Sequence, residues 1–321
     1  MLCEFPRQGY TEGHVNVRGA RVHYLHAGSG RPLLLIHGLV GSSANWRRNI
    51  DALAKDASVY AIDMVNMGES ERIAGIDAGL EATADRIVAC MDALGLAQAD
   101  FAAHSHGGAV VLMLAARHPE RVRSLILFAP ANPFSDFRDS MVRFCNTPPG
   151  RLAAYAVPYL PRQVQRIGLG RMYGDPARIS EGDLQAYTDG LRVQGTVRHI
   201  LEIVRGWFRE MAKLKIVLPQ VASIPTLLVW GCRDRAVDPA SAMQLQRVLW
   251  QSELRIVRGG GHIVFEEMAE QSNRLMLDWL RRDLTSHPLS AGAVEYYATR
   301  VPRARRRPTS VPAPAKTSAA V

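Results

Sequence analysis

Short apolar runs and longer amphipathic segments alternate along most of this chain. Residues 15–17 and 21–26 alternate between apolar and polar positions, which predicts an antiparallel hairpin. Residues 33–36 form a continuous apolar run, typical of a strand buried on both faces, and further strands are expected at residues 59–62, 100–103, 124–128, 225–231 and 254–257. Helices are expected between them, at residues 45–55, 80–94, 106–117, 240–251 and 266–282. Because strands alternate with helices, the pattern predicts an α/β fold with a doubly wound, mostly parallel sheet.

The alternation stops between residues 133 and 218. Apolar runs with strand character disappear there, and helical stretches rich in Arg, Leu and Tyr alternate with Pro and Gly. We interpret this segment as a helical cap inserted into the sheet domain. The predicted domains are a first core part at 1–132, the cap at 133–218, a second core part at 219–286 and a disordered tail at 287–321.

The tail at 287–321 is too poor in apolar residues to order itself, being rich in Pro, Ala, Arg, Ser and Thr. It also carries much of the chain's formal charge of +9. Six basic side chains and one acidic side chain give the tail a net charge of +5, which leaves +4 for the rest. Because the charge lies largely outside the expected folded body, the sequence predicts neither a nucleic-acid groove nor an anionic-membrane surface.

Composition places few other limits on the chain. Of its 321 residues, 47% are hydrophobic and 21% are charged, which is ordinary for a globular protein with a substantial core. Residues 1–7 lack the pattern of a signal peptide, and no stretch reaches the roughly 18 apolar residues of a membrane-spanning helix. The four cysteines are scattered without metal-binding spacing. We therefore expect a cytoplasmic protein with no metal, no cofactor and no disulfide framework.

The stretch around Ser105 carries the clearest chemical signal. An apolar run leads into Ser105, Gly107 and Gly108 follow it, and an alanine-rich helical segment comes next. This pattern of strand, tight turn and helix places Ser105 at the apex of the turn, with its hydroxyl above the carboxyl end of the sheet. Such a turn needs small neighbours, because the strand and helix backbones nearly touch. Ala103 and the two glycines meet that requirement.

A serine hydroxyl needs a base to take its proton, and the base needs an orienting carboxylate. Asp234 directly follows a predicted strand, and His262 follows the last predicted strand after three glycines. Asp238 is the rival acid, but an Asp followed by Pro is typical of a helix start. His104 and His106 flank the serine and are expected to pack or to support the turn, since side chains on either side of an apex point elsewhere.

These motifs resemble those of the alpha/beta-hydrolase family, in its capped serine-hydrolase branch. Ser105 lies in a version of the G-x-S-x-G nucleophile elbow in which Ala103 replaces the first glycine. The order Ser, Asp, His along the chain also matches the family, and the resemblance covers about residues 15–282. It implies a catalytic triad in which Ser105 is the nucleophile, His262 the general base and Asp234 the acid that orients it.

The resemblance also implies an oxyanion hole. The backbone N–H of His106 gives one donor, and Leu39 gives the second from a loop similar to the family's H-G-x motif, in which His37 is expected to be structural. Residues 63–70 are similar to the family's D-x-x-G-x-G-x-S loop, with Asn66 in place of a glycine. Asn tolerates left-handed backbone angles, so the loop is expected to survive the change, with Asp63 as scaffold.

The expected activity is that of a serine hydrolase, which cleaves a carboxylic ester of a small, largely apolar substrate through an acyl-enzyme. Apolar cap residues at 153–160, together with Val204, Trp207, Phe208 and Met211, are expected to wall the substrate pocket. One alternative keeps the triad but cleaves a carbon–carbon bond in a meta-cleavage product, whose carboxylate the cap arginines would hold. A further alternative is a non-catalytic receptor or accessory protein on the same fold. The expected partner is the small-molecule substrate, with no nucleic acid and no integral membrane segment, and a homodimer is left open.

Overall fold

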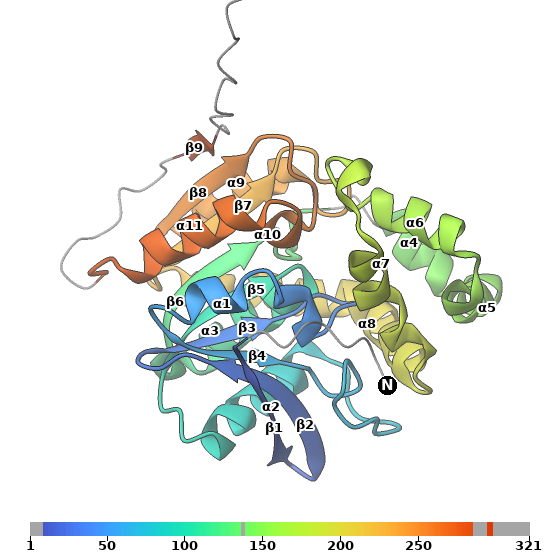
Figure 1. Cartoon of the computed structure of the whole chain (residues 1–321), viewed down its shortest axis with the longest axis horizontal. Coiled ribbons are helices and arrows are strands. Elements are labelled where there is room, and N and C mark those ends of the chain that lie inside the picture. Colours follow the sequence, from blue (N-terminus) through green and yellow to red (C-terminus); the bar gives the residue numbers. More distant parts are fainter. Residues whose placement is uncertain (1–8, 136–138, 285–293, 298–321) are drawn as a thin grey trace, which may run out of the picture.

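The computed structural model describes residues 9–135, 139–284 and 294–297, which form a single sheet covered by helices (Figure 1). Its strands are β1 (Thr11–Val17), β2 (Ala20–Ala27), β3 (Pro32–Ile36), β4 (Ser58–Ile62), β5 (Ala99–His104), β6 (Val122–Phe128), β7 (Thr226–Gly231), β8 (Ser252–Val257) and β9 (Val294–Tyr297). Within the described residues the strand order is β1-β2-β4-β3-β5-β6-β7-β8-β9. Only the pairings of β1 with β2 and of β2 with β4 are antiparallel. The predicted α/β fold with a doubly wound, mostly parallel sheet is confirmed.

The central strands bury both of their faces. Successive side chains of a strand point to opposite sides of the sheet, so a continuous apolar run feeds two cores. In β3, Leu34 and Ile36 join one hydrophobic cluster while Leu33 and Leu35 join the other. Helices α2 (Leu80–Ala93), α3 (His106–Arg117) and α9 (Pro239–Val248) complete the first cluster. Helices α1 (Ile50–Leu53) and α11 (Ala269–Leu280) complete the second.

Between β6 and β7 the described chain is helical, as the loss of strand-like runs predicts. Its helices are α4 (Asp139–Cys145), α5 (Pro148–Ala156), α6 (Arg162–Gly170), α7 (Glu181–Thr188) and α8 (Thr196–Val217). Short 3-10 turns connect them, namely η3 (Val157–Tyr159), η4 (Pro176–Arg178), η5 (Gly190–Arg192) and η6 (Leu218–Val221). Figure 1 shows these helices gathered on one side of the sheet domain. The domain boundaries at 133 and 218 stay predictions.

Two predicted helices are interrupted. The helix expected at 45–55 is a 3-10 turn, η1 (Ser43–Trp46), followed by α1, and the break lies at the buried Asn49, whose φ is −115°. The helix expected at 266–282 is divided into α10 (Val264–Glu267) and α11 at Met268, whose φ is −125°. A further 3-10 turn, η2 (Pro119–Arg121), precedes β6.

The predicted disordered tail contains one strand. Residues 294–297 form β9, which pairs in parallel with β8 in the register Leu254 to Val294. The expectation of a tail without order is therefore wrong for these four residues, because the edge of β8 offers backbone N–H and C=O groups that a short extended segment can pair. The tail at 287–293 and 298–321 lies outside the described residues.

Candidate active site

Ser105 lies in the sharp turn that joins β5 to α3. Its φ of 50° and ψ of −120° are unusual for a residue with a side chain, and such strain persists only where the surroundings fix it. The Ser105 N–H donates to Phe128 O at 3.0 Å, and Ser105 O accepts from the N–H of Ala131 at 2.9 Å. These bonds tie the turn to the end of β6. The predicted strand, turn and helix around the serine are confirmed.

The turn is as crowded as the glycines predict. A Cβ added to Gly107 would lie 2.3 Å from His37 O, and one added to Gly108 would lie 2.6 Å from Pro130 Cβ. Neither position has room for a side chain. The start of α3 can therefore approach the end of β3, which carries the loop with Gly38 and Leu39.

His262 and Asp234 meet at the carboxyl ends of β8 and β7. His262 Nδ1 lies 2.9 Å from Asp234 Oδ2, and both residues are buried. The second carboxylate oxygen, Oδ1, accepts the backbone N–H groups of Ala236 at 2.7 Å and Val237 at 3.0 Å. The carboxylate is thus held on both sides, and it fixes which imidazole nitrogen faces it. Asp234 is positioned to orient His262.

Asp238 has a different task. Its side chain accepts from the N–H of Ala240 at 2.9 Å, at the N-terminus of α9, with Pro239 in the first helical position. This is the helix start that the Asp-Pro pair predicts. The carboxylate of Asp238, the rival acid, is therefore engaged in capping α9.

His104 connects the serine turn to His262. Its Nε2 lies 3.1 Å from His262 O, and the two rings are 4.6 Å apart. Burial holds the pKa of His104 well below the ordinary value for histidine, so the ring is neutral. His104 therefore supports the turn, and it joins the residue before Ser105 to the backbone of His262.

His106 is the other flanking histidine, and burial lowers its pKa to about 3. Its ring stacks on Trp207 of α8, with centroids 6.4 Å apart. Nδ1 has no hydrogen-bond partner among the described residues. Such a weakly basic ring is a poor proton acceptor, as expected for a packing residue. The contact with Trp207 is one that the sequence does not reveal, because nothing in it aligns α8 with the serine turn.

The loop after β3 lies against the serine. A Cβ added to Gly38 would lie 2.8 Å from His104 Nδ1 and 3.3 Å from Ser105 Cβ. Within the described residues, neither the N–H of Leu39 nor that of His106 donates a hydrogen bond to protein. His37 is fully buried, and its ring bridges Gly38 O at 2.8 Å and the N–H of Met64 at 3.0 Å. Two backbone donors are thus left open near Ser105, and His37 has the structural contacts expected of it.

The loop at 63–70 has Asn66 where the family motif has a glycine, and Asn66 adopts the backbone conformation that a glycine would supply. Asn66 has a φ of 70°, the left-handed conformation that its sequence position predicts. Asp63 Oδ2 lies 2.8 Å from His23 Nδ1 and accepts the N–H of Glu69 at 2.8 Å, while Oδ1 accepts the N–H of Ser43 at 2.5 Å. With both oxygens engaged, Asp63 is scaffold, as expected.

Glu267 binds the His262 loop to the cap, a role that the sequence does not specify. Its carboxylate accepts the N–H groups of Gly261 at 2.8 Å, Gly174 at 2.9 Å and Asp175 at 2.9 Å. His262 N–H donates to Met172 O at 2.7 Å. Any movement of this cap segment is therefore transmitted to the candidate base.

Glu266 lies at the centre of a buried ionic cluster between core and cap, which sequence reasoning missed. Arg47 binds both Glu266 and Asp183 of α7, and Arg48 binds Asp183 at 2.8 Å. Tyr187 donates to Glu266 Oε2 at 2.9 Å and Tyr173 to Oε1 at 3.3 Å. Burial raises the pKa of Glu266 to about 7, although Arg47 opposes the shift. In the sequence, this cluster is indicated only by two pairs of adjacent charged residues, Arg47-Arg48 and Glu266-Glu267.

The expected apolar wall of the cap is only partly formed. Val204 and Met211 are buried and Trp207 is partly buried, but Tyr155 is 44% exposed and Tyr159 is 76% exposed. The exposed position of Tyr159 removes it as a pocket-lining candidate, whereas Tyr155 lines a polar cavity beside α8. The cause is the packing of α5 and η3, which turns Pro158 inward and its neighbours outward.

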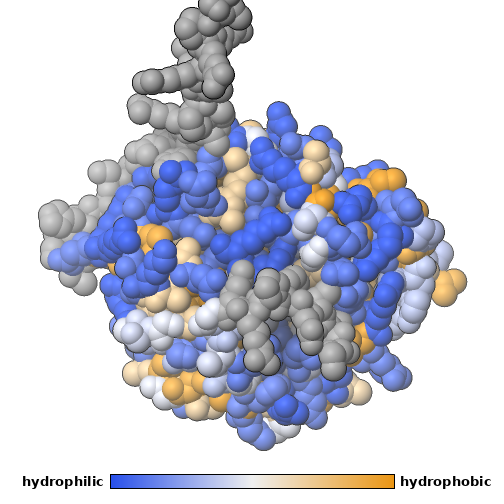
Figure 2. All heavy atoms as spheres, viewed as in Figure 1, coloured by the Kyte–Doolittle hydropathy of each residue, from blue (hydrophilic) through white to orange (hydrophobic). Residues whose placement is uncertain are grey.

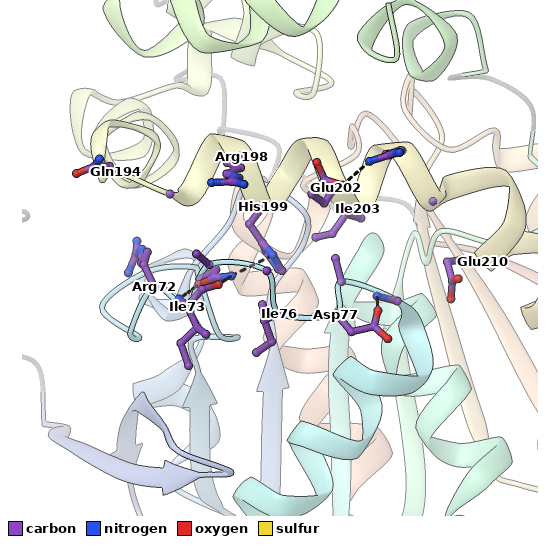
Figure 3. Close-up of a pocket in the computed structure, with 18 of the residues that line it drawn as sticks. Arg72, Ile73, Ile76, Asp77, Gln194, Arg198, His199, Glu202, Ile203 and Glu210 are labelled. Carbon is purple, nitrogen blue, oxygen red and sulfur yellow. Dashed lines mark hydrogen bonds and ion pairs between the residues drawn. The ribbon is translucent and has the colours of Figure 1, made fainter.

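A polar cavity of about 1090 Å³ lies between α8 and the segment at residues 72–79 (Figure 3). His199 reaches down from α8 to Asn66, with 3.1 Å between His199 Nδ1 and Asn66 Nδ2. Arg72, Arg198 and Glu202 also line it. Its lining does not include Ser105, Asp234 or His262, so the cavity is separate from the candidate triad.

Two other kinds of site were sought in the described residues. No group of three or more His, Cys, Asp and Glu side chains is arranged there to hold a metal ion. None of the helices in those same ranges has the length and apolar character to cross a bilayer.

Comparison with known proteins gives four matches. A family profile described as the alpha/beta hydrolase fold matches residues 31–269. A dihydrolipoyllysine-residue acetyltransferase component of the acetoin cleaving system, from Pseudomonas putida, is 31% identical over 86% of this chain and 70% of its own length. A 2-hydroxymuconate semialdehyde hydrolase from Pseudomonas sp. (strain CF600) is 43% identical over 35% of this chain and 41% of its own. Among solved structures, Cfl2 from Burkholderia cenocepacia superimposes with a TM-score of 0.78 at 22% identity, over 88% of this chain and 99% of that one.

Proposed function

The chain belongs to the alpha/beta hydrolase fold family, and on that premise we propose that it is a serine hydrolase of carboxylic esters. The substrate is small and largely apolar, and the reaction passes through an acyl-enzyme. The observation that carries the proposal is the 2.9 Å contact between His262 and Asp234, next to a strained turn with Ser105 at its apex. A buried carboxylate, a histidine and an apex serine are the three groups that acyl transfer requires.

Each group has one role in the proposed reaction. Ser105 Oγ attacks the ester carbonyl while His262 Nε2 takes its proton, and Asp234 stabilises the imidazolium that forms. His262 then protonates the leaving alcohol, which leaves Ser105 acylated. Water, deprotonated by the same histidine, hydrolyses the acyl-enzyme and restores the serine.

The oxyanion formed at the carbonyl requires donors that are already in place. We assign them to the backbone N–H groups of Leu39 and His106. Both are without a protein acceptor in the described residues, and Gly38 brings the loop of Leu39 against Ser105. One such donor contributes roughly 3–4 kcal/mol of transition-state stabilisation.

The alternative reaction is hydrolysis of a carbon–carbon bond in a meta-cleavage product. Its support is the 43% identity, over a third of the chain, to a hydrolase named for 2-hydroxymuconate semialdehyde. The same triad would act, and a cap arginine would hold the substrate carboxylate. A non-catalytic receptor on the same fold is the third candidate, and the Asp234–His262 contact disfavours it.

Two other features belong to the proposal. Cys90, Cys145 and Cys232 are free thiols in the described part of the chain, which agrees with a reducing, cytoplasmic location. A homodimer is not required for the site, because one chain supplies all the groups named above.

A substrate profile on the full-length protein tests the proposal. A p-nitrophenyl ester series from acetate to octanoate is assayed beside a 2-hydroxy-6-oxo-dienoate, with Ser105→Ala as the matched control. Ester turnover that rises over the first few methylenes, by up to about 0.8 kcal/mol each, and that Ser105→Ala abolishes supports the ester hydrolase. Faster turnover of the dienoate supports the alternative reaction. Failure of a fluorophosphonate to label Ser105 contradicts both and leaves the receptor.

A further inference from the structure

The cap presents an unusual surface segment at residues 141–171. It contains five arginines and no acidic residue. Among the described residues, 14 large hydrophobic side chains are exposed, and nine of them belong to residues 141–167. These nine are Met141, Phe144, Leu152, Tyr155, Val157, Tyr159, Leu160, Val164 and Ile167. A concentration of this kind marks an interaction site, whereas single exposed hydrophobics do not.

The exposed side chains follow the helical spacing, so they gather on common faces. Val164 and Ile167 lie three residues apart on α6, and Leu160 precedes the helix, while Gln165 and Leu169 of the same helix are buried. Helix α6 therefore turns apolar side chains outward as well as inward. Surface helices normally place polar residues outward, so the outer face of α6 is unusual in leaving apolar side chains exposed among the described residues.

The second helix continues the same surface. Leu152 of α5 is 73% exposed, Tyr159 of η3 is 76% exposed and Ile167 of α6 is 67% exposed. At the right-hand edge of Figure 2, where Figure 1 labels α5 and α6, isolated hydrophobic groups lie among polar and pale-coloured ones. We call the outward surface of α5, η3 and α6 the cap face.

Arginines surround the cap face, and their few carboxylate partners come from outside it. Arg166 binds Glu181 at 2.9 Å and Arg151 binds Glu202 at 3.2 Å. Arg143 lies over the ring of Phe208 at 5.0 Å. The five arginines of 141–171 and these two glutamates leave a net charge of +3. Because the pairs are exposed, they contribute little and can be exchanged for another anion.

We propose that the cap face docks on an anionic lipid membrane. Apolar side chains of α5 and α6 enter the boundary between headgroups and acyl chains, and the arginines meet the lipid phosphates. Tyr159 provides an amphipathic ring, of the kind that is enriched at such a boundary. Since the described helices include none that could span a bilayer, this is binding to the surface.

Charge also decides between a membrane and a second copy of this chain. A two-fold dimer through the cap face would place the same patch against itself, and so arginine against arginine. A lipid surface offers the opposite sign. The net charge of +4 on residues 1–286 comes from this segment, because residues 141–171 carry five arginines and no acid, and the rest of that range carries −1. The charge distribution along the sequence predicted no surface for an anionic membrane. The exposed apolar and basic side chains of the cap lead us to revise that prediction.

Vesicle sedimentation with the full-length chain tests the proposal. Vesicles of phosphatidylcholine alone are compared with vesicles of phosphatidylcholine and phosphatidylglycerol. Leu152→Ser combined with Ile167→Ser should lower the partition coefficient at least about tenfold, because two inserted side chains become polar. Arg143→Gln combined with Arg171→Gln should lower it by about fivefold per arginine, on the anionic vesicles only.

Matched controls lie on α8 of the same cap. Ile216 is 77% exposed and Lys215 is also exposed, so Ile216→Ser and Lys215→Gln make the same chemical changes away from the cap face. Both should leave partitioning within about twofold of the unsubstituted protein. Melting temperature and turnover of a soluble ester, measured on every variant, show that the fold is intact.

Three results would overturn the proposal. The unsubstituted chain could remain in the supernatant with both kinds of vesicle. The Leu152→Ser, Ile167→Ser protein could bind as tightly as its parent, in which case the basic tail, present in both, accounts for binding. Finally, sedimentation velocity could show a dimer that these substitutions dissociate, without vesicle binding, which assigns the cap face to a second copy.

Discussion

Asp234 holds His262 by a 2.9 Å contact between Oδ2 and Nδ1 while its Oδ1 accepts two backbone N–H groups. The carboxylate cannot turn away from the imidazole without losing those two bonds. The histidine is therefore oriented by a group that is itself fixed to the loop after β7.

Replacing Asp234 by Asn should lower kcat by about 10⁴-fold in a folded protein, because the amide favours the wrong tautomer of His262. Asp238→Asn is the matched control. Asn caps a helix about as well as Asp, so this change should alter kcat by less than about threefold. The assay is ester turnover with melting temperature measured in parallel. If Asp238→Asn proved the more harmful change, the acid would have to be reassigned.

Ser105→Ala and His262→Ala should each abolish measurable ester turnover. Since the two residues act in the same step, the double variant should be hardly slower than either single one. Burst kinetics with a p-nitrophenyl ester measure both the acyl-enzyme and the steady state. Rate losses that multiply in the double variant would contradict a shared mechanism.

Gly38→Ala should damage catalysis more than stability. The added methyl group would lie 2.8 Å from His104 Nδ1 and 3.3 Å from Ser105 Cβ, so the Leu39 loop must move away from the serine. We expect kcat to fall by about 10²-fold with little change in KM, the effect of a misplaced oxyanion donor. Gly168→Ala is the control, because nothing lies within 4 Å of its new methyl group. Equal losses in both variants would exclude this role for the loop.

Glu266 should make stability depend on pH. Burial raises its folded pKa from 4.5 to about 7, so between these values the folded state keeps a proton that the unfolded state releases. Stability should therefore fall as the pH rises from about 4.5 to 7, by at most about 3 kcal/mol. Glu266→Gln should remove this pH dependence. The free energy of unfolding of the variant at pH 8 should therefore be closer to its value at pH 5 than in the unsubstituted protein.

Urea unfolding at pH 5 and pH 8 checks the Glu266 prediction. Glu270→Gln is the control, because Glu270 is 87% exposed on α11. Among the described residues, its one ion pair is with Arg274 at 3.5 Å. That variant should follow the pH dependence of the unsubstituted protein. A Glu266→Gln protein with an unchanged pH dependence would show that other groups set it.

The sequence determined the sheet, because burial on both faces demands continuous apolar runs and a half-exposed hairpin demands alternation. It also determined the backbone of the serine turn. Gly107 tolerates no Cβ, and Asn66 adopts the left-handed angle that its place in the loop requires. Residue identity was enough to predict both features, because glycine has no Cβ and Asn tolerates left-handed angles. The group that excludes a Cβ at Gly107, His37 O, comes from the fold.

Only the tertiary structure decided which distant groups meet. The pairing of Asp234 with His262 was predicted from motif order, but the bonds that fix it come from the fold. The cluster of Arg47, Asp183 and Glu266 joins three segments far apart in the chain, and no local pattern aligns them. The cap face is also a tertiary property. A helix with apolar residues on two sides does not show which side the core will cover, and that choice depends on how α5 and α6 pack.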